Sequence, residues 1–228
     1  MESKHHSKII YSKENDVFKI ETSKEVLEAK KVILSLGASA KTLGIESEQR
    51  LRGMGVSYCA TCDGGFFKGA EVAVVGGGNT AFEDAIYLSR ICKKVYIIHR
   101  RDAFRADKIL QEEAKSKENI EFVYNSEVEE IVGKFEVEGV KVRNKVSNEL
   151  TEIPVSGVFI AVGVKPNSDL VDDLVEKDED GYIITDNNMR TNVDGIYAVG
   201  DVRNTNLRQV ITACADGAIA INDIVTIR

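Results

Sequence analysis

Short apolar runs that end at or near glycine alternate along the chain with stretches in which apolar residues follow helical spacing. The runs at 31–37, 157–163 and 195–201 are apolar almost throughout, which is typical of strands covered on both faces. The best-defined unit runs from Glu71 to Arg105, with a strand at 72–75, a glycine turn, a helix and a strand at 95–98. This order predicts two parallel strands joined by a right-handed crossover.

The rest of the chain predicts further elements of both kinds, and therefore an α/β fold. A polar loop is expected from the first apolar run to about Tyr58. The last helix is rich in small side chains and is expected to be tightly packed. The expected strands are 8–11, 17–20 and 120–124, the hairpin-like region is 127–153, and the expected helices are 107–117 and 209–224.

Length and composition narrow the function classes. The 228 residues, 43% of them apolar, suit one or two globular domains. A net charge of -7 argues against broad binding to nucleic acid or anionic membranes. No apolar run reaches the roughly 20 residues that span a bilayer, and residues 1–8 lack the apolar core of a signal peptide. Four cysteines are too few for a disulfide scaffold, so a cytoplasmic location is expected.

A nucleotide-binding fingerprint follows the strand at 72–75. Gly76, Gly78 and Ala81 fit G-x-G-x-x-G/A, in which the first glycine forms the turn and the second admits a pyrophosphate. The third small residue lets the helix pack on the strand, and the free N–H groups of the turn, including Asn79 and Thr80, face the phosphates. The alternative is a glycine-rich turn that binds nothing, but the strand–helix–strand context favours a nucleotide.

Basic residues lie where an NAD site carries an acid. That position, about 20 residues beyond the fingerprint, binds the ribose 2′-hydroxyl when it is acidic. Here His99, Arg100 and Arg101 occupy it, and Arg105 follows. Guanidinium groups pair with a 2′-phosphate, so NADPH is predicted over NADH. The alternative is a solvated basic loop.

Cys59 and Cys62 form a C-x-x-C pair just ahead of the fingerprint. Such a pair suits a redox dithiol or half of a zinc site, but structural zinc commonly takes two pairs and the other cysteines are isolated, so no metal is expected. A merely structural pair is the remaining alternative. Asp63 follows directly and could shuttle a proton during thiol–disulfide exchange, although Asp-Gly-Gly is also a plausible tight turn.

Taken together, these segments resemble a known family. The chain contains, in order, Cys-Ala-Thr-Cys-Asp-Gly, Val-Val-Gly-Gly-Gly-Asn-Thr-Ala, His-Arg-Arg-Asp-Ala-Phe-Arg-Ala, Ile-Ala-Val-Gly-Val-Lys-Pro-Asn, Gly-Ile-Tyr-Ala-Val-Gly-Asp-Val and Leu-Arg-Gln-Val. From about Val32 onward it is similar to the low-molecular-weight bacterial thioredoxin reductases. The Cys-Ala-Thr-Cys core argues against the related alkyl-hydroperoxide-reductase flavoproteins.

The resemblance implies a Rossmann-like, three-layer NADPH-binding domain inserted into an FAD/NAD(P)-binding domain. The NADPH domain, which carries the C-x-x-C pair, would be residues 42–156, and the FAD-binding parts would be 1–41 and 157–228. FAD and NADPH are implied as cofactors, with thioredoxin or a thioredoxin-like disulfide protein as the substrate. A homodimer and a rotation of one domain against the other are implied as well.

The resemblance also implies roles for single residues. Cys62 resembles the thiol nearer the flavin, Cys59 the thiol that attacks the thioredoxin disulfide, and Asp63 the acid/base. Further positions resemble cofactor ligands: Thr80, Arg100, Arg101 and Arg105 for NADPH; Asp201 beside Val202 for the flavin ribityl chain; and Arg208, Gln209 and Val210 along the flavin ring. Taken alone, the C-terminal set equally fits a turn aspartate and a polar helix start.

One part of the family pattern is missing. Family members begin with a strand–glycine–helix motif for the ADP half of FAD, and no second G-x-G-x-x-G occurs here; Leu36 also replaces an expected threonine. We expect an N-terminally truncated chain with a self-sufficient NADPH domain and a compromised FAD remnant, because a central parallel strand would be lost. The hypotheses are a working disulfide reductase, a catalytically impaired NADPH-binding fragment without stable FAD and, last, a metal-binding module.

Overall fold

The computed structural model describes residues 8–12 and 17–226 of the chain. It divides into two compact units. One, here called the inner unit, is residues 40–163; the other, the outer unit, combines residues 1–39 with residues 164–228.

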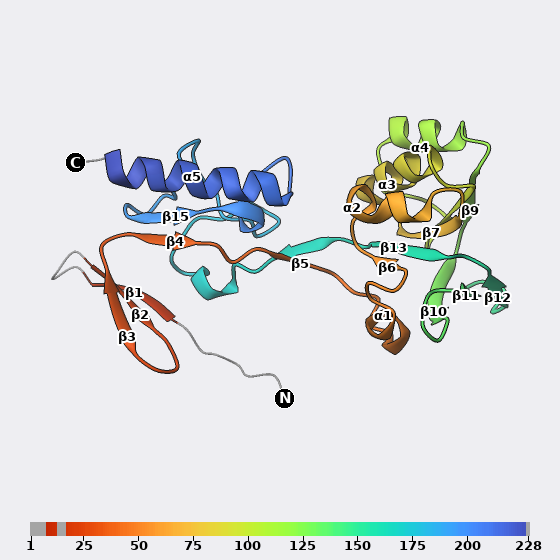
Figure 1. The fold of residues 1–228 in the computed structure, drawn as a ribbon, viewed down its shortest axis with the longest axis horizontal. Helices are drawn as coiled ribbons and strands as arrows, with labels where there is room; N and C mark the ends of the chain where they lie inside the picture. Colours follow the sequence, from red (N-terminus) through yellow and green to blue (C-terminus); the bar gives the residue numbers. More distant parts are fainter. Residues whose placement is uncertain (1–7, 13–16, 227–228) are drawn as a thin grey trace. The chain divides into compact units, whose positions relative to one another are not determined.

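The inner unit is built on a five-stranded parallel sheet in the order β6-β13-β7-β8-β9 (Figure 1). Two helices, α3 (Asn79–Ser89) and α4 (Lys108–Lys115), lie along one side of it. The predicted strand–turn–helix–strand unit is confirmed as β7, α3 and β8. The strand bounds are β6 Val56–Ser57, β13 Gly157–Ala161, β7 Glu71–Gly76, β8 Lys94–Ile98 and β9 Ile120–Val123.

Side-chain alternation along β7 shows the layers of this unit. Val72 and Val74 pack in one buried cluster with Phe82 and Leu88 of α3. Ala73 and Val75 point the other way, into a cluster with residues of an antiparallel sheet. That sheet consists of β10 (Ser126–Val132), β11 (Gly139–Asn144) and β12 (Leu150–Ile153), and confirms the predicted hairpin region. The inner unit is therefore a helix layer, a parallel sheet and an antiparallel sheet.

Strand β13 lies in a different unit from the one that the sequence predicted for it. The predicted division placed residues 157–163 with the FAD-binding parts, whereas β13 pairs with β7 along its whole length and with β6 at Val158 and Phe159. An apolar run shows that a strand is buried, but it does not show which sheet buries it. The predicted polar loop before Tyr58 also contains the short helix α1 (Glu46–Arg50) and strand β6.

The described residues of the outer unit form three small sheets and one long helix. Strands β1 (Lys8–Ser12), β2 (Val17–Glu21) and β3 (Val26–Ala29) form an antiparallel sheet, and β4 (Val32–Leu34) pairs in parallel with β15 (Ile196–Ala198). Strands β5 (Ala38–Ala40) and β14 (Val164–Pro166) form the third. Helix α5 (Val210–Thr226) lies over β15.

The predicted tight packing of the last helix is wrong for its outward face. Of the α5 residues only Asp216, Ala220 and Asp223 are buried, whereas Val210 and Ile211 are 80% and 76% exposed. Two aspartates hold the helix instead, because each accepts hydrogen bonds from an arginine on the segments beneath it. No described helix is both long and apolar enough to cross a bilayer.

Candidate active site

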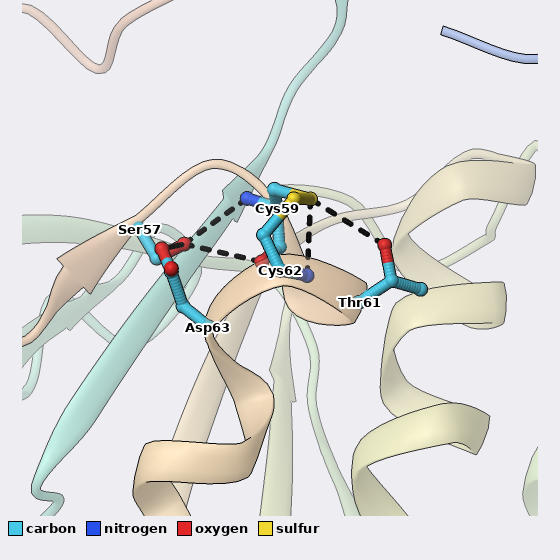
Figure 2. Close-up of a disulfide and its surroundings, with 5 residues drawn as sticks. All are labelled: Ser57, Cys59, Thr61, Cys62 and Asp63. Carbon is cyan, nitrogen blue, oxygen red and sulfur yellow. Dashed lines mark hydrogen bonds between the residues drawn. A yellow bond between two sulfur atoms is a disulfide. The ribbon is translucent and has the colours of Figure 1, made fainter. Parts of the chain in front are cut away.

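The C-x-x-C pair begins helix α2 (Ala60–Asp63) at the end of strand β6 (Figure 2). Cys59 and Cys62 are joined by a disulfide, with their Cα atoms 5.3 Å apart. The sulfur of Cys59 accepts the backbone N–H of Cys62 at 3.2 Å and lies 3.4 Å from the Thr61 hydroxyl. A hydrogen bond from a backbone N–H also stabilises a thiolate, so the pair is placed for redox exchange. Cys62 is exposed and Cys59 is half-buried.

Asp63 is tied to the same segment through a serine that the sequence analysis did not identify. The Ser57 hydroxyl donates to Oδ2 of Asp63 at 2.6 Å and accepts the N–H of Cys59 at 3.1 Å. Asp63 is half-buried. Nothing in the sequence pattern singles out Ser57, because its hydrogen bond to Asp63, six residues later, forms only when the segment folds.

An open, largely apolar cavity of about 460 Å³ adjoins this acid. Asp63 and Ser57 contribute to its wall, together with the side chains of Met54, Phe66 and Phe135. Those three apolar side chains are 53%, 86% and 73% exposed. Exposed aromatic side chains around a cavity are typical of surfaces that bind another molecule.

The glycine turn has two tight positions and one open position. Strand β7 ends at Gly76, where a Cβ atom would lie 2.4 Å from the carbonyl oxygen of Ala161 and 2.8 Å from Cβ of Ala81. A Cβ atom on Gly77 would lie 2.3 Å from the ring of His99. At Gly78 nothing lies within 4 Å, so its backbone is open to a ligand. The space fits the phosphates of a dinucleotide at the start of α3.

Asn79, a predicted cofactor ligand, lies at the surface and forms hydrogen bonds with another segment of the chain. Its Nδ2 donates to Asp107 Oδ2 and its Oδ1 accepts the N–H of Asp107, both at 2.9 Å. The carbonyl of Gly77 accepts the N–H of Arg105 at 2.8 Å. These contacts hold the basic loop against the glycine turn. Thr80 remains exposed in the first turn of α3.

His99 lies beneath the turn and is only 7% exposed. Its Nε2 is 3.2 Å from the carbonyl oxygen of Ala103, and its ring packs against Phe104 at 5.1 Å between centroids. Burial, with nearby arginines adding to the effect, lowers the pKa of His99 and keeps the ring neutral. The ring therefore packs between the glycine turn and the basic loop.

The three predicted arginines are exposed and free to bind an anion. Arg100, Arg101 and Arg105 all lie at the surface, and within residues 17–226 none of them forms an ion pair. The backbone bond from Arg105 to Gly77 places this basic loop beside the glycine turn. The geometry therefore fits a dinucleotide with an additional phosphate.

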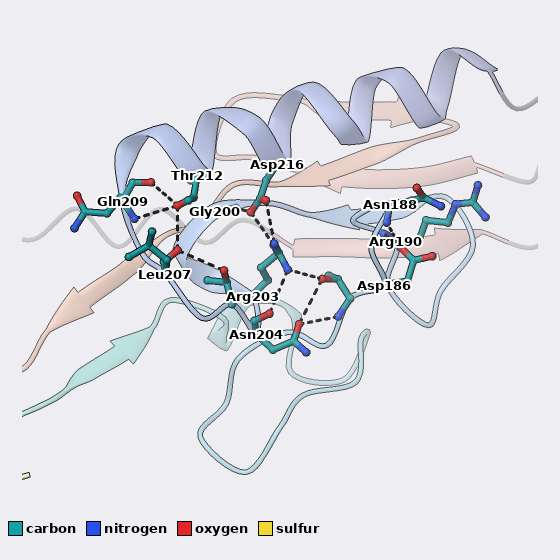
Figure 3. A network of polar contacts seen from close by, with 12 residues as sticks. Asp186, Asn188, Arg190, Gly200, Arg203, Asn204, Leu207, Gln209, Thr212 and Asp216 are labelled. Carbon is teal, nitrogen blue, oxygen red and sulfur yellow. Dashed lines mark hydrogen bonds and ion pairs between the residues drawn. The ribbon is translucent and has the colours of Figure 1, made fainter. Parts of the chain in front are cut away.

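The predicted flavin residues lie in the outer unit. Figure 3 shows one of them, Gln209, in the polar network at the start of α5. Asp201 is half-exposed and its neighbour Val202 is fully buried. The carboxylate of Asp216 on α5 accepts the N–H of Gly200 at 3.0 Å and pairs with Arg203 at 2.7 and 2.9 Å, which fixes the turn that carries Asp201.

Arg208, Gln209 and Val210 form the segment that leads into α5. The Arg208 guanidinium stacks on the Tyr182 ring, 4.0 Å from its centroid, and its buried Nε has no hydrogen-bond partner. Gln209 is half-buried, while Val210 is exposed. The segment offers backbone and polar groups for the ring and ribityl parts of a flavin. The described residues of the outer unit contain no glycine-rich turn for the ADP half, so the fit to FAD is partial.

The family profile described as pyridine nucleotide-disulphide oxidoreductase matches residues 2–217. The chain belongs to this family. It is 49% identical over 207 residues to the thioredoxin reductase of Peptoclostridium acidaminophilum, which covers 88% of this chain and 66% of that protein. It is also 49% identical over 193 residues to the thioredoxin reductase of Listeria monocytogenes, covering 84% and 60%.

Solved structures of the family show the same fold. The crystal structure of thioredoxin reductase from Streptococcus pyogenes matches with a TM-score of 0.90 and 43% identity, over 97% of this chain and 72% of that one. Thioredoxin reductase from Giardia duodenalis matches with a TM-score of 0.87 and 34% identity, over 96% and 72%. The predicted resemblance to thioredoxin reductases is confirmed. The chain spans about two thirds or less of the length of the curated relatives named above.

Among the described residues, the predicted site residues lie in three groups. The redox pair with Asp63 and the glycine turn with the basic loop both lie in the inner unit, and the flavin set lies in the outer unit. The described residues contain no group of three or more His, Cys, Asp or Glu side chains that could hold a metal ion.

Proposed function

We propose that the chain carries the NADPH site and the redox-active disulfide of a thioredoxin-disulfide reductase. The observation that supports this most directly is that Cys59–Cys62, bonded to one another and adjoining Asp63, share one compact unit with the glycine turn. In this proposal the inner unit is a Rossmann-like NADPH domain, inserted into an FAD-binding domain to which the outer unit belongs.

The open backbone of Gly78 and the unpaired arginines support binding of NADPH. The pyrophosphate would lie against the N–H groups at the start of α3, where the helix dipole is positive. Arg100, Arg101 and Arg105 would hold the 2′-phosphate. Ala81 keeps the helix close to β7, while Asn79 and His99 position the turn rather than touch the nucleotide.

The redox step uses the disulfide as a two-electron carrier. FAD, if bound, would supply the relay for two electrons from NADPH to this disulfide. The residues that would hold it are Asp201, Val202, Arg208, Gln209 and Val210. With two electrons and two protons, the Cys59–Cys62 bond opens to a dithiol. We assign Cys62 to the flavin side and Cys59 to the substrate side.

Exchange with the substrate then regenerates the disulfide. The Cys59 thiolate attacks one sulfur of the substrate disulfide, and the other substrate sulfur leaves as a thiolate. The Cys62 thiolate attacks the Cys59 sulfur of the mixed disulfide, which releases the reduced substrate. Asp63, hydrogen-bonded to Ser57, takes and returns the proton.

The substrate proposed is thioredoxin or a thioredoxin-like disulfide protein. Its docking surface would be the cavity beside Asp63, where Met54, Phe66 and Phe135 expose apolar area. A homodimer in a reducing cytosol is the expected setting, and sedimentation analysis of the purified chain tests the dimer.

Two substitutions test this division of labour. Cys62→Ser should abolish NADPH-dependent disulfide reduction and leave NADPH affinity unchanged, as measured by nucleotide titration. Arg100→Glu should weaken NADPH far more than NADH, because only NADPH carries the 2′-phosphate. Equal loss of both affinities in Arg100→Glu, or loss of nucleotide binding in Cys62→Ser, contradicts the assignment.

A catalytically impaired NADPH-binding fragment is the second candidate. It is favoured by the lack of a second glycine-rich phosphate turn in the sequence, which leaves the ADP half of FAD without its usual site. The visible spectrum of the purified chain separates the two. Stoichiometric bound flavin supports the reductase, whereas a colourless chain that binds NADPH supports the fragment.

A further inference from the structure

Tyr58 lies between the end of β6 and the redox pair, and its hydroxyl is anchored in the protein interior. It donates to Oε1 of Glu48 at 2.7 Å. Glu48 is completely buried, and its Oε2 accepts the N–H groups of Leu43 and Gly44 at 2.9 and 3.1 Å. Burial and the hydrogen bond to Glu48 raise the pKa of Tyr58 to about 12, so the hydroxyl stays a donor at physiological pH.

The Glu48 carboxylate that holds Tyr58 is itself held in place by its surroundings. It belongs to helix α1, and the preceding residue, Ser47, is also buried. The Ser47 Oγ accepts the N–H of Ile131 on β10 at 2.9 Å, which ties α1 to the antiparallel sheet. Three donors satisfy the buried Glu48 carboxylate, as such a group requires.

The end of β6 needs such a tether because the strand is very short. It has two residues, and only Val56 and Ser57 pair with β13. Ser57 in turn bonds to the backbone of Cys59 and to the Asp63 carboxylate. Movement of the chain at Tyr58 would therefore displace Cys59 relative to Cys62, which is fixed in α2.

We propose that Tyr58, held by buried Glu48, is a positioning residue that fixes Cys59 beside Cys62 and so favours the disulfide over the dithiol. Holding two reacting groups together raises their effective concentration. A higher effective concentration of the two thiols stabilises the disulfide relative to the dithiol. The proposal depends on the proposed function only in taking this couple as the redox centre.

The test is the Tyr58→Phe variant of the full chain, equilibrated with reduced and oxidised dithiothreitol without nucleotide or flavin. Dithiothreitol loses two electrons and two protons as its thiols close into a ring, and the Cys59–Cys62 bond gains them. Without the tether, we expect the equilibrium to move toward the dithiol by about threefold or more, which is about 14 mV for a two-electron couple. Alkylation followed by mass spectrometry counts the two forms.

Tyr96→Phe is the matched control. Its hydroxyl donates to Oε2 of Glu71 at 3.1 Å in the same unit, so this variant also removes a tyrosine–glutamate bond but lies away from the cysteines. We expect it to lower the melting temperature without moving the equilibrium. A Tyr58→Phe variant that shows only the lower melting temperature, a shift toward the disulfide, or an equal shift in Tyr96→Phe overturns the proposal.

Glu48→Gln tests whether the hydrogen bond to Tyr58 or the buried negative charge of Glu48 sets the Cys59–Cys62 equilibrium. Its amide oxygen can accept from Leu43 and Gly44 while its nitrogen donates to the Tyr58 oxygen, so we expect an equilibrium close to that of the parent chain. A shift as large as that of Tyr58→Phe contradicts the assignment to the hydrogen bond.

If Tyr58→Phe does not fold, its combination with Glu48→Gln removes the unpaired charge and should show the same threefold shift. If the disulfide–dithiol equilibrium shifts in Tyr58→Phe but the parent chain shows no NADPH-dependent activity, this inference stands and only the proposed function is rejected.

Discussion

The three glycines of the 76–78 turn differ in what surrounds their α-carbons. Substitutions at the crowded and the open positions should therefore affect stability and nucleotide binding separately. We expect Gly76→Ala to destabilise the chain by about 1–3 kcal/mol, because the new methyl group meets the carbonyl of Ala161. Gly78→Ala should leave the melting temperature unchanged and weaken NADPH, because only a ligand needs that space. Thermal unfolding and nucleotide titration measure the two effects. A Gly78→Ala variant with full affinity would place the phosphates elsewhere.

The four cysteines differ in reactivity for reasons that the sequence cannot show. Burial raises the pKa of the Cys92 thiol to about 11, so it stays protonated and shielded at pH 8. Cys214 is exposed on α5, and Cys59–Cys62 react only after reduction. A native thiol titration at pH 8 should therefore count one thiol before reduction and three afterwards. Rapid labelling of Cys92 would contradict its placement in the core.

At the scale of elements, α5 is held mainly by buried charge. Asp223 is 8% exposed and accepts from Arg190 at 2.7 and 2.6 Å and from Tyr197 at 2.8 Å. The Arg190 guanidinium and the Tyr197 hydroxyl lower the pKa of Asp223 despite its burial. A lowered pKa means that this stabilisation is complete above the unfolded value of about 3.9 and is lost as the pH falls through the folded value.

The corresponding prediction concerns the acid side of the stability curve. The parent chain should lose melting temperature below about pH 4, whereas Asp223→Asn should melt lower at pH 7 and change less on acidification. Asp169→Asn, at an exposed pair with Lys165, is the control and should leave the melting temperature at pH 7 nearly unchanged, because solvent screens an exposed ion pair. If the melting temperatures of the parent chain and of Asp223→Asn depend on pH in the same way, Asp223 does not hold α5 in place.

At the scale of the whole molecule, the two units differ in how completely they bury their sheets. The inner unit encloses its parallel sheet between helices and an antiparallel sheet, with two large apolar clusters. In the outer unit, the described part of the parallel sheet has two strands, and α5 exposes an apolar face. Stability follows buried apolar area, so the inner unit should be the more autonomous.

We therefore predict that residues 40–163 fold without the rest of the chain. The isolated unit should melt in one cooperative transition and bind NADPH within about threefold of the affinity of the full chain. Circular dichroism and nucleotide titration measure both properties. A non-cooperative melt, or loss of binding by the isolated unit, would mean that the outer unit supplies part of the nucleotide site.

Sequence alone determined the chemistry that depends on local order. The redox pair lies within four residues, and the fingerprint needs only a strand, small residues at fixed spacing and a helix. These features act through backbone geometry that neighbours in sequence set, which is why β7, α3 and β8 match the prediction. The arginines could be placed for the same reason, because the end of one strand fixes where the next loop begins.

Tertiary structure decided whatever depends on contacts between distant segments. Strand β13 pairs with β7 although about 80 residues separate them, and its apolar pattern fits any buried sheet position. Asn79 and His99 look like ligands by position, yet Asp107 and the underside of Gly77 engage them. Ser57, Glu48 and Tyr58 carry no motif, because a buried hydrogen-bond partner becomes visible only when the folded chain brings it within reach.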